Sequence, residues 1–364
     1  MSNTRTKTLL QYVIPAILTN TCIFLFTIID GIFVGNGVGM DSLGADAFYM
    51  PMVKEYVFWW ALFAIPSALS VNFQCFCRND GSPMLVMGAT IISTVLNIFL
   101  DWLFIFPMEM GIMGAALATG ISQTVAWLIV LMHFIQKKGD LRIKAYTPDG
   151  SLYGKVLFRG LPEMIAQFAT PVTTICLNHV LIQNLGDFGV NVFAIISYVA
   201  SFAMSVLFGA SEGLQPLFGQ SYGAKEEKDL KYYLRSGMVI CFAGSTLCVL
   251  ISVVFARPIG TLFGAEGEVL DFTVKYMPQY AWAFIIAGFN TLVSAYLYST
   301  KRSVHAIILN VVRSFVINIL VIVGLSALAG AEIVWFTFGI SECLILVIAF
   351  LLKQMSEKNG VEFR

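Results

Sequence analysis

Ten long apolar stretches follow one another along this chain of 364 residues. A helix needs about 20 consecutive apolar residues to cross the hydrocarbon core of a bilayer. Composition agrees, because 58% of the residues are hydrophobic and 12% are charged, whereas soluble proteins average about 25% charged residues. We therefore expect an all-α polytopic membrane protein. The ten expected spans cover residues 8–35, 55–77, 84–106, 112–136, 161–184, 190–219, 233–256, 273–299, 304–325 and 331–352.

The distribution of lysine and arginine predicts the orientation. If the N-terminus is cytoplasmic, 18 of the 22 basic residues lie in cytoplasmic segments, and only Lys54, Arg257 and Lys275 lie outside. This is the asymmetry of the positive-inside rule. The remaining residue, Arg313, lies within a span. We expect a multi-pass protein of the cell membrane, in contact with lipid, with both termini in the cytoplasm. The net charge of zero gives no reason to expect a nucleic-acid partner.

The longest polar stretch, KKGDLRIKAYTPDGSLYGKVLFR at 137–159, suggests a connection between two halves. We expect an N-terminal bundle at 1–137, a cytoplasmic linker at 138–159 and a C-terminal bundle at 160–364. The seven cysteines all lie in apolar spans without a CxxC pair or a histidine cluster. This pattern predicts neither disulfides nor a zinc site, and no cofactor is expected.

The two halves contain an internal repeat. LGADAFYMPMVKEY at 43–56 parallels FGAEGEVLDFTVKY at 263–276, VLNIFL at 95–100 parallels VINILV at 316–321, and GIS at 120–122 parallels GIS at 339–341. These offsets are 220, 221 and 219 residues, but IPAILTN at 14–20 answers LPEMIAQ at 161–167 at an offset of only 147. About 73 residues, the difference between 220 and 147, are therefore present once. They correspond to two helices within 190–256, so the bundles are expected to hold four and six helices.

Several motifs resemble the multidrug and toxic compound extrusion (MATE) family of cation-coupled efflux transporters. The matching residues are Pro15, DGIFVGNGVGMDSLGA at 30–45, RNDGSP at 78–83, LNIFLD at 96–101, GIMGAALATGISQ at 111–123 and GLQPLFGQSYGA at 213–224. Family members have two six-helix bundles facing a central cavity. The resemblance implies that this chain is a form of that 6 + 6 architecture lacking the second and third helices of the first bundle.

Four polar residues are candidates for a coupling-ion site. Asn97 and Asp101 are four residues apart and therefore share a helix face. Together with Asp30 and Thr119 they fall within a slab of roughly 6 Å, at about 1.5 Å per helical residue. Oxygen ligands suit a hard cation, and a carboxylate within the membrane is usually paired or protonated. The resemblance also places the family's sodium or proton site at these four positions. Hydrogen bonding between helices is the competing interpretation for the amide and the hydroxyl.

A second group could handle substrate or protons in the C-terminal half. Glu163 begins a span, Gln167 and Asn178 follow on it, and Glu212 lies deeper within the next span. Glu163 could also be a first-turn acid that complements the helix dipole. Intramembrane ionisable residues are functional candidates by default. Arg313 is either the ion-pair partner of Glu212 or a residue that reaches the cytoplasmic face.

The leading hypothesis is an antiporter that exports small organic cations or drugs in exchange for sodium or protons by alternating access. A shortened chain that cannot transport is the main alternative, unless a second copy of the chain replaces the missing helices. A flippase for lipid-linked saccharides would be expected to carry more intramembrane basic residues than Arg313. An intramembrane aspartyl protease would use Asp30 and Asp101 as a dyad, but their sequence context does not resemble one. We therefore expect a transporter and not an enzyme.

Overall fold

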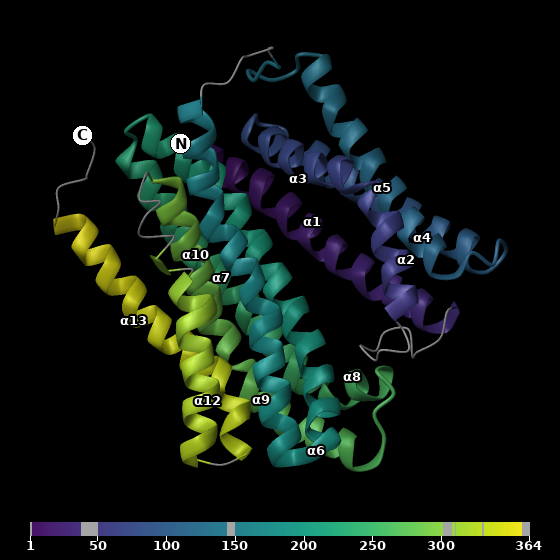
Figure 1. Ribbon diagram of the computed structural model, residues 1–364. Helices are drawn as coiled ribbons and strands as arrows, with labels where there is room; N and C mark the ends of the chain where they lie inside the picture. Colours follow the sequence, from purple (N-terminus) through teal and green to yellow (C-terminus); the bar gives the residue numbers. More distant parts are fainter. Residues whose placement is uncertain are drawn as a thin grey trace. The chain divides into compact units, whose positions relative to one another are not determined.

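The computed structural model describes residues 2–37, 50–143, 150–300, 308–309, 311–329 and 331–358. Most of these residues are helical, and none of them lies in a β-strand (Figure 1). It divides into two compact units, Met1–Ala145 and Tyr146–Arg364, called here the N-terminal unit and the C-terminal unit. The expected all-α fold class is confirmed.

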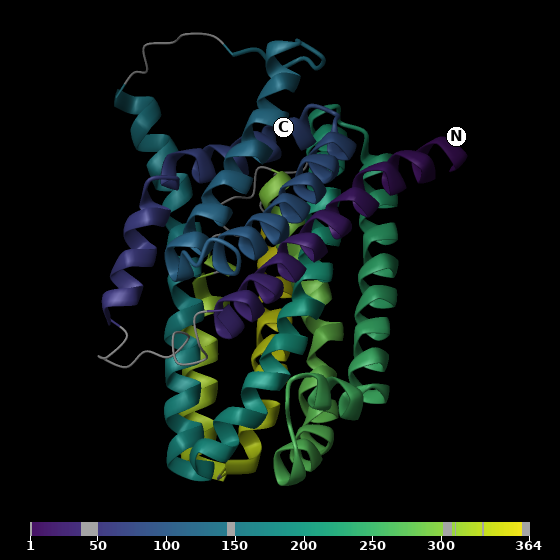
Figure 2. The same ribbon diagram turned by 90° about the vertical axis from the view of Figure 1, so that its right-hand side faces the viewer.

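Helix α4 organises the N-terminal unit because it packs against both α1 and α5, while α2 and α3 pack against α5 (Figures 1 and 2). Pro83 begins α4, at a position where the missing backbone N–H needs no partner. The helices of this unit are α1 (Ser2–Gly37), α2 (Met50–Ala61), α3 (Ala64–Asn79), α4 (Pro83–Ile105) and α5 (Gly111–Ile135).

A helical hairpin formed by α6 organises the C-terminal unit. Its two arms meet at Gly186, whose φ of 64° and ψ of −164° are not helical and favour glycine. Leu181 of the first arm and Val192 of the second share a core cluster with Trp335. The elements of this unit are α6 (Gly150–Gly223), α7 (Glu227–Val254), α8 (Ala256–Leu262), α9 (Gly267–Ala281), α10 (Ala283–Ser299), η3 (Val312–Ile317), α12 (Asn318–Ala329), η4 (Ala331–Phe336) and α13 (Thr337–Lys358).

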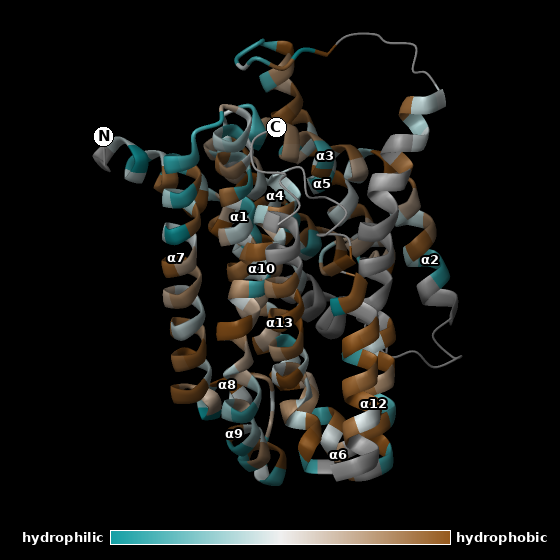
Figure 3. Ribbon diagram, turned by 90° about the vertical axis from the view of Figure 1, so that its left-hand side faces the viewer, coloured by the Kyte–Doolittle hydropathy of each residue, from teal (hydrophilic) through white to brown (hydrophobic). Residues whose placement is uncertain are grey.

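Seven helices among the described residues are long and apolar enough to cross a membrane, or eight if the bent pair 54–61 and 64–79 forms one span. These eight lie at eight of the ten expected positions. Of the other two, 161–184 is helical, although its side chains up to residue 171 are outside the described set, and 304–325 is only partly described. Figure 3 shows hydrophobic residues along the shaft of α7 and hydrophilic residues at its end.

The division into two units falls between Ala145 and Tyr146, within the segment expected to link the bundles. Helix α6 begins at Gly150, so its first turns also belong to that segment. The expected bundle and linker boundaries at 137 and 160 stay predictions.

A glycine packs against an aromatic ring at a helix break in both units. A Cβ added to Gly120 would lie 2.2 Å from the ring of Phe63, which stands between α2 and α3. A Cβ added to Gly339 would lie 2.1 Å from the ring of Trp282, which stands between α9 and α10. The glycines are 219 residues apart, and so are the aromatic residues. The offset therefore matches the internal repeat found in the sequence.

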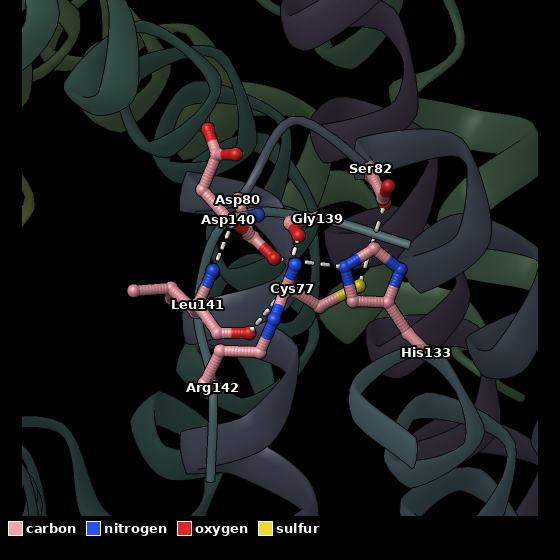
Figure 4. A network of polar contacts seen from close by, with 8 residues as sticks. All are labelled: Cys77, Asp80, Ser82, His133, Gly139, Asp140, Leu141 and Arg142. Atoms are coloured by element: carbon pink, nitrogen blue, oxygen red, sulfur yellow. Dashed lines mark hydrogen bonds and ion pairs between the residues drawn. The ribbon is translucent and has the colours of Figure 1, made fainter. Parts of the chain in front are cut away.

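A polar clamp closes one end of the N-terminal unit (Figure 4). The Oδ2 atom of Asp80 lies 3.0 Å from His133 Nε2, and its Oδ1 accepts hydrogen bonds from the backbone N–H groups of Asp140 and Leu141 at 2.8 and 3.1 Å. A Cβ at residue 139 would lie 1.7 Å from Asp80 Oδ2, so Gly139 permits this approach. The clamp holds the segment after α5 against the ends of α3 and α5.

Opposing effects act on the pKa of the Asp80 carboxyl. Burial by itself raises this pKa, but the hydrogen bonds from His133, Leu141 and Asp140 outweigh burial and lower it from its usual value of 3.8. A carboxylate whose pKa is lowered by folding stabilises the folded protein fully at any pH above its usual pKa. This stabilisation is lost only as the pH falls through the lowered pKa. The clamp is therefore fully formed at neutral pH.

We expect Gly120→Ala and Gly339→Ala each to destabilise the protein by about 1–3 kcal/mol, because the added methyl group overpacks an aromatic ring. Thermal unfolding in detergent measures the effect. Gly88→Ala and Gly324→Ala are the matched controls, since a Cβ at either position meets nothing within 4 Å. Equal unfolding temperatures for all four variants would contradict the packing argument.

We expect Asp80→Ala to raise the rate of trypsin cleavage after Arg142 at least about fivefold, because hydrogen bonds to a charged group contribute about 1.5–3 kcal/mol. Limited proteolysis at neutral pH measures the rate. Asp140→Ala removes an exposed carboxylate from the same loop and serves as the control. If both variants are cleaved at the same rate, the Asp80 carboxylate does not hold this loop.

Candidate functional site

A row of polar side chains runs along one face of α4. Thr90, Ser93, Asn97 and Asp101 are spaced three or four residues apart, and all four are buried. This spacing places them on one face of a helix. Since α4 packs against α1 and α5, the row lies inside the N-terminal unit and not at its lipid-facing surface.

Thr90 and Ser93, at the N-terminal end of the row, form hydrogen bonds within the protein. Thr90 Oγ1 donates to the backbone carbonyl of Val86 at 3.1 Å, and Ser93 Oγ donates to the backbone carbonyl of Ser122 in α5 at 2.8 Å. The second bond fixes the height of α4 against α5. It therefore sets which residues of α5 lie beside Asn97, one turn further along α4.

Asn97 and Thr119 carry polar atoms that the described residues leave without a hydrogen-bond partner. Both side-chain atoms of the Asn97 amide and the Oγ1 atom of Thr119 are buried in this way. Leaving a buried polar group without a partner costs about 1–3 kcal/mol. Asp101, one turn from Asn97, is completely buried. This part of the row therefore offers oxygen atoms that a small cation or a proton could satisfy.

The expected fourth member, Asp30, lies on α1, which packs against α4. Its side chain is outside the described set, so its place in the site stays a prediction. Among the described residues, no group of three or more histidine, cysteine, aspartate or glutamate side chains could hold a metal ion. The donor set of Asn97, Asp101 and Thr119 contains one carboxylate, one amide and one hydroxyl. These groups are hard oxygen donors of the kind that alkali and alkaline-earth cations prefer.

The expected substrate group of the C-terminal half is only partly described. The side chains of Glu163 and Gln167 lie outside the described set. Asn178 and Glu212 are both partly buried, on different arms of the α6 hairpin. Asn178 precedes Gly186 by eight residues and Glu212 follows it by 26. This difference of 18 residues places them at levels about 27 Å apart along the hairpin, so Asn178 and Glu212 do not form one local site.

Arg313 pairs with a residue that the sequence analysis did not single out. Its Nη2 and Nε atoms donate to Oε1 of Glu342 at 2.9 and 3.0 Å. The sequence is compatible with a pair between Arg313 and Glu212 or with a position of Arg313 near the cytoplasmic face, whereas in the structure Arg313 pairs with Glu342. The available signal was a lone glutamate in the apolar segment ISECLIL at 340–346, because a charged residue within a span needs a partner.

Residues 162–324 match the family model described as MatE. The chain is 25% identical over 323 residues to the multidrug export protein MepA of Staphylococcus saprophyticus, and the alignment covers 87% of this chain and 68% of that protein. In Staphylococcus aureus, a protein of the same name is 25% identical over 315 residues, covering 85% and 68% of the two chains.

Solved structures share the fold. A mutant of the MATE transporter VcmN from Vibrio cholerae superposes with a TM-score of 0.78 at 21% identity, covering 98% of this chain and 87% of that chain. A transporter of the MOP superfamily from Pyrococcus furiosus superposes with a TM-score of 0.79 at 18% identity, covering 97% and 96%. The MatE match over residues 162–324 and the alignments with multidrug export proteins relate the chain to the MATE transporters, and the solved structures show that it has the same multi-pass helical fold.

Proposed function

We propose that the chain is an antiporter that exports small organic cations or drugs across the cell membrane in exchange for sodium ions or protons. The observation that carries the proposal is the set of buried oxygen atoms on α4 and α5. Asn97 on α4 and Thr119 on α5 have polar atoms without a partner among the described residues, and Asp101, one turn from Asn97, is buried. The names of the multidrug export relatives support drugs as the substrates.

The coupling follows from differential affinity. A cation bound at Asp101, Asn97 and Thr119, with Asp30 as the proposed fourth ligand, favours whichever conformation completes its coordination. Binding can shift the equilibrium only by the difference in affinity between the two states. In alternating access, that difference favours the state that releases the organic cation outward. Both termini are proposed to be cytoplasmic, so that the coupling ion enters from the outer face.

Substrate handling is proposed for the C-terminal unit, at Glu163, Gln167, Asn178 and Glu212. The large separation between Asn178 and Glu212 along α6 suggests that they act at different stages and do not form a single pocket. Glu163 and Gln167 precede Gly186 by 23 and 19 residues, so they lie closer to the level of Glu212 than to that of Asn178 and would contact the substrate together with Glu212. A cationic drug needs a negative or aromatic partner to compensate for the loss of its hydration, and Glu163 and Glu212 can supply the negative charge.

A transport-inactive chain is the second candidate, because the expected first bundle lacks two helices of the family architecture. The alignments cover 68% of the relatives' length, which is consistent with a shorter chain. A lipid flippase is disfavoured by the pairing of Arg313 with Glu342, because this pairing neutralises the single basic residue predicted within a span. The experiment below separates transport from inactivity.

We expect cells that lack their own drug pumps to expel a fluorescent cationic dye when they express this chain and carry an inward sodium or proton gradient. Asp101→Asn should lower the gradient-dependent rate at least about tenfold, within the range of 5–150-fold typical of coupling energies. Asn97→Ala and Thr119→Ala should weaken coupling less. Imposing the sodium gradient at constant pH, and the pH gradient without sodium, identifies the ion.

The matched control is Asp271→Asn, which makes the same chemical change at an exposed carboxylate paired with Arg257. It should expel dye at the wild-type rate. Absence of efflux from wild-type chain that is expressed and inserted in the membrane would overturn the proposal and support the inactive alternative. Efflux that Asp101→Asn leaves unchanged would refute the coupling site while leaving export intact.

A further inference from the structure

A buried ion pair joins η3 to α13 inside the C-terminal unit. Arg313 reaches Glu342 through two hydrogen bonds to the same carboxylate oxygen. The Glu342 side chain is 2% exposed and the Arg313 side chain is 12% exposed. The Glu342 carboxylate is therefore almost completely shielded from solvent, and most of the remaining exposure of the pair belongs to Arg313.

Asn290, on α10, also forms hydrogen bonds with Glu342. Its Nδ2 atom donates to Oε2 of Glu342 at 2.7 Å and to the Glu342 backbone carbonyl at 2.9 Å. The Oδ1 atom of Asn290 is buried without a partner among the described residues. Both carboxylate oxygens of Glu342 therefore accept hydrogen bonds, and the side chain that fixes Oε2 is itself only half satisfied.

Arg313 is carried by an unusual backbone. Residues Val312–Ile317 form a π-helical turn, and α12 continues from it as an α-helix. Such turns are rare, occur mostly as single turns and are frequent at functional sites. Conversion of a π-helical turn to an α-helix changes the direction of its side chains. This conversion would therefore change the position of Arg313 relative to Glu342.

At the corresponding position of the internal repeat, neutral groups join the helices of the N-terminal unit. Ser93 donates to the backbone of Ser122. The repeat offsets of 221 and 219 residues lead from these two serines to Ser314 and Ser341, the neighbours of Arg313 and Glu342. A neutral hydrogen bond thus suffices to join the corresponding helices. A buried ion pair often stabilises a fold no better than apolar residues of similar size, so the charges of Arg313 and Glu342 indicate a role beyond packing.

Few other ionisable groups face Glu342. Tyr280 of α9 and Cys343 of α13 are close enough to interact with it electrostatically. Residues 318–329 of α12 contain no ionisable side chain. Glu332 of η4 is exposed and pairs with Lys275, and Tyr296 of α10 packs against Phe218. Arg313 is therefore the dominant charge beside Glu342 among the described residues.

We propose that Glu342 is a proton-binding carboxylate of the C-terminal unit, and that its protonation releases Arg313 and remodels the π-helical turn at Val312–Ile317. The proton adds to a carboxylate oxygen and gives a neutral acid, which no longer compensates the guanidinium. Both carboxylate oxygens already accept hydrogen bonds from Arg313 and Asn290, so a larger cation would have to displace one of these donors. Only the role of this proton in transport rests on the proposed antiport.

The test measures hydrogen–deuterium exchange of peptides covering 312–317 in the full chain, reconstituted in lipid nanodiscs without substrate or ion gradient. After correction for the intrinsic exchange rate, wild-type protection should fall at least about tenfold as the pH is lowered, since local opening sets this protection. Glu342→Gln, which mimics the protonated acid, should be weakly protected at every pH. Glu332→Gln, the same change at an exposed glutamate of the same unit, should behave as wild type.

Two results overturn the proposal. One is wild-type protection that does not vary with pH, and the other is a Glu342→Gln variant that keeps the wild-type pH dependence. If Glu342→Gln does not fold, Arg313→Gln replaces it and should also be weakly protected at every pH, because the turn has lost its anchor. A wild-type pH dependence in Arg313→Gln would then overturn the proposal. Dye efflux is measured separately. If it refutes the proposed antiport, the exchange data still test whether protonation of Glu342 remodels the turn.

Discussion

The interior of a bilayer offers no hydrogen-bond partner, and the arrangement of this chain depends on that constraint. Helices satisfy the backbone N–H and C=O groups internally, which is why most of the described residues are helical. Polar side chains must then meet inside each unit. On α4, Thr90 and Ser93 find backbone carbonyls, whereas Asn97 and Thr119 keep polar atoms that the described residues do not satisfy. A bound ion or proton there can supply the contacts that the polar atoms of Asn97 and Thr119 lack.

The spans could be predicted because apolar length is a local property of the sequence. The polar pairs could not, because each joins residues that only the packed helices bring together. Asp80 and His133 are 53 residues apart, and Asn290 and Glu342 are 52 apart. The partner of Arg313 was even harder to predict, because the π-helical turn interrupts the α-helical periodicity that shows which residues share a helix face. The spacing predicted that Asn97 and Asp101 share a helix face, and both residues are buried on α4; the ion site itself stays a prediction.

The repeat shows how related halves can differ in chemistry. Gly120 against Phe63 and Gly339 against Trp282 make the same contact at the same offset, because a ring can approach a helix closely only where no Cβ intervenes. The helices on either side of Phe63 are bent by 59°. Beside Ser314 and Ser341, the counterparts of Ser93 and Ser122, the C-terminal unit by contrast carries the charges of Arg313 and Glu342. Packing at the glycines is thus shared between the units, while the electrostatic character of their interiors is not.

The two polar centres differ in what they can bind. Asn97 and Thr119 offer atoms without partners among the described residues, so a cation there would gain contacts without displacing a protein group. Glu342 already holds a guanidinium, and removing one member of a buried ion pair costs about 3–5 kcal/mol. Shifting a two-state equilibrium from 1:99 to 99:1 takes about 5.5 kcal/mol. Protonation of Glu342 would therefore supply most of the free energy of such a shift. Because Arg313 is the more exposed member of the pair, the guanidinium is the group that would move toward water.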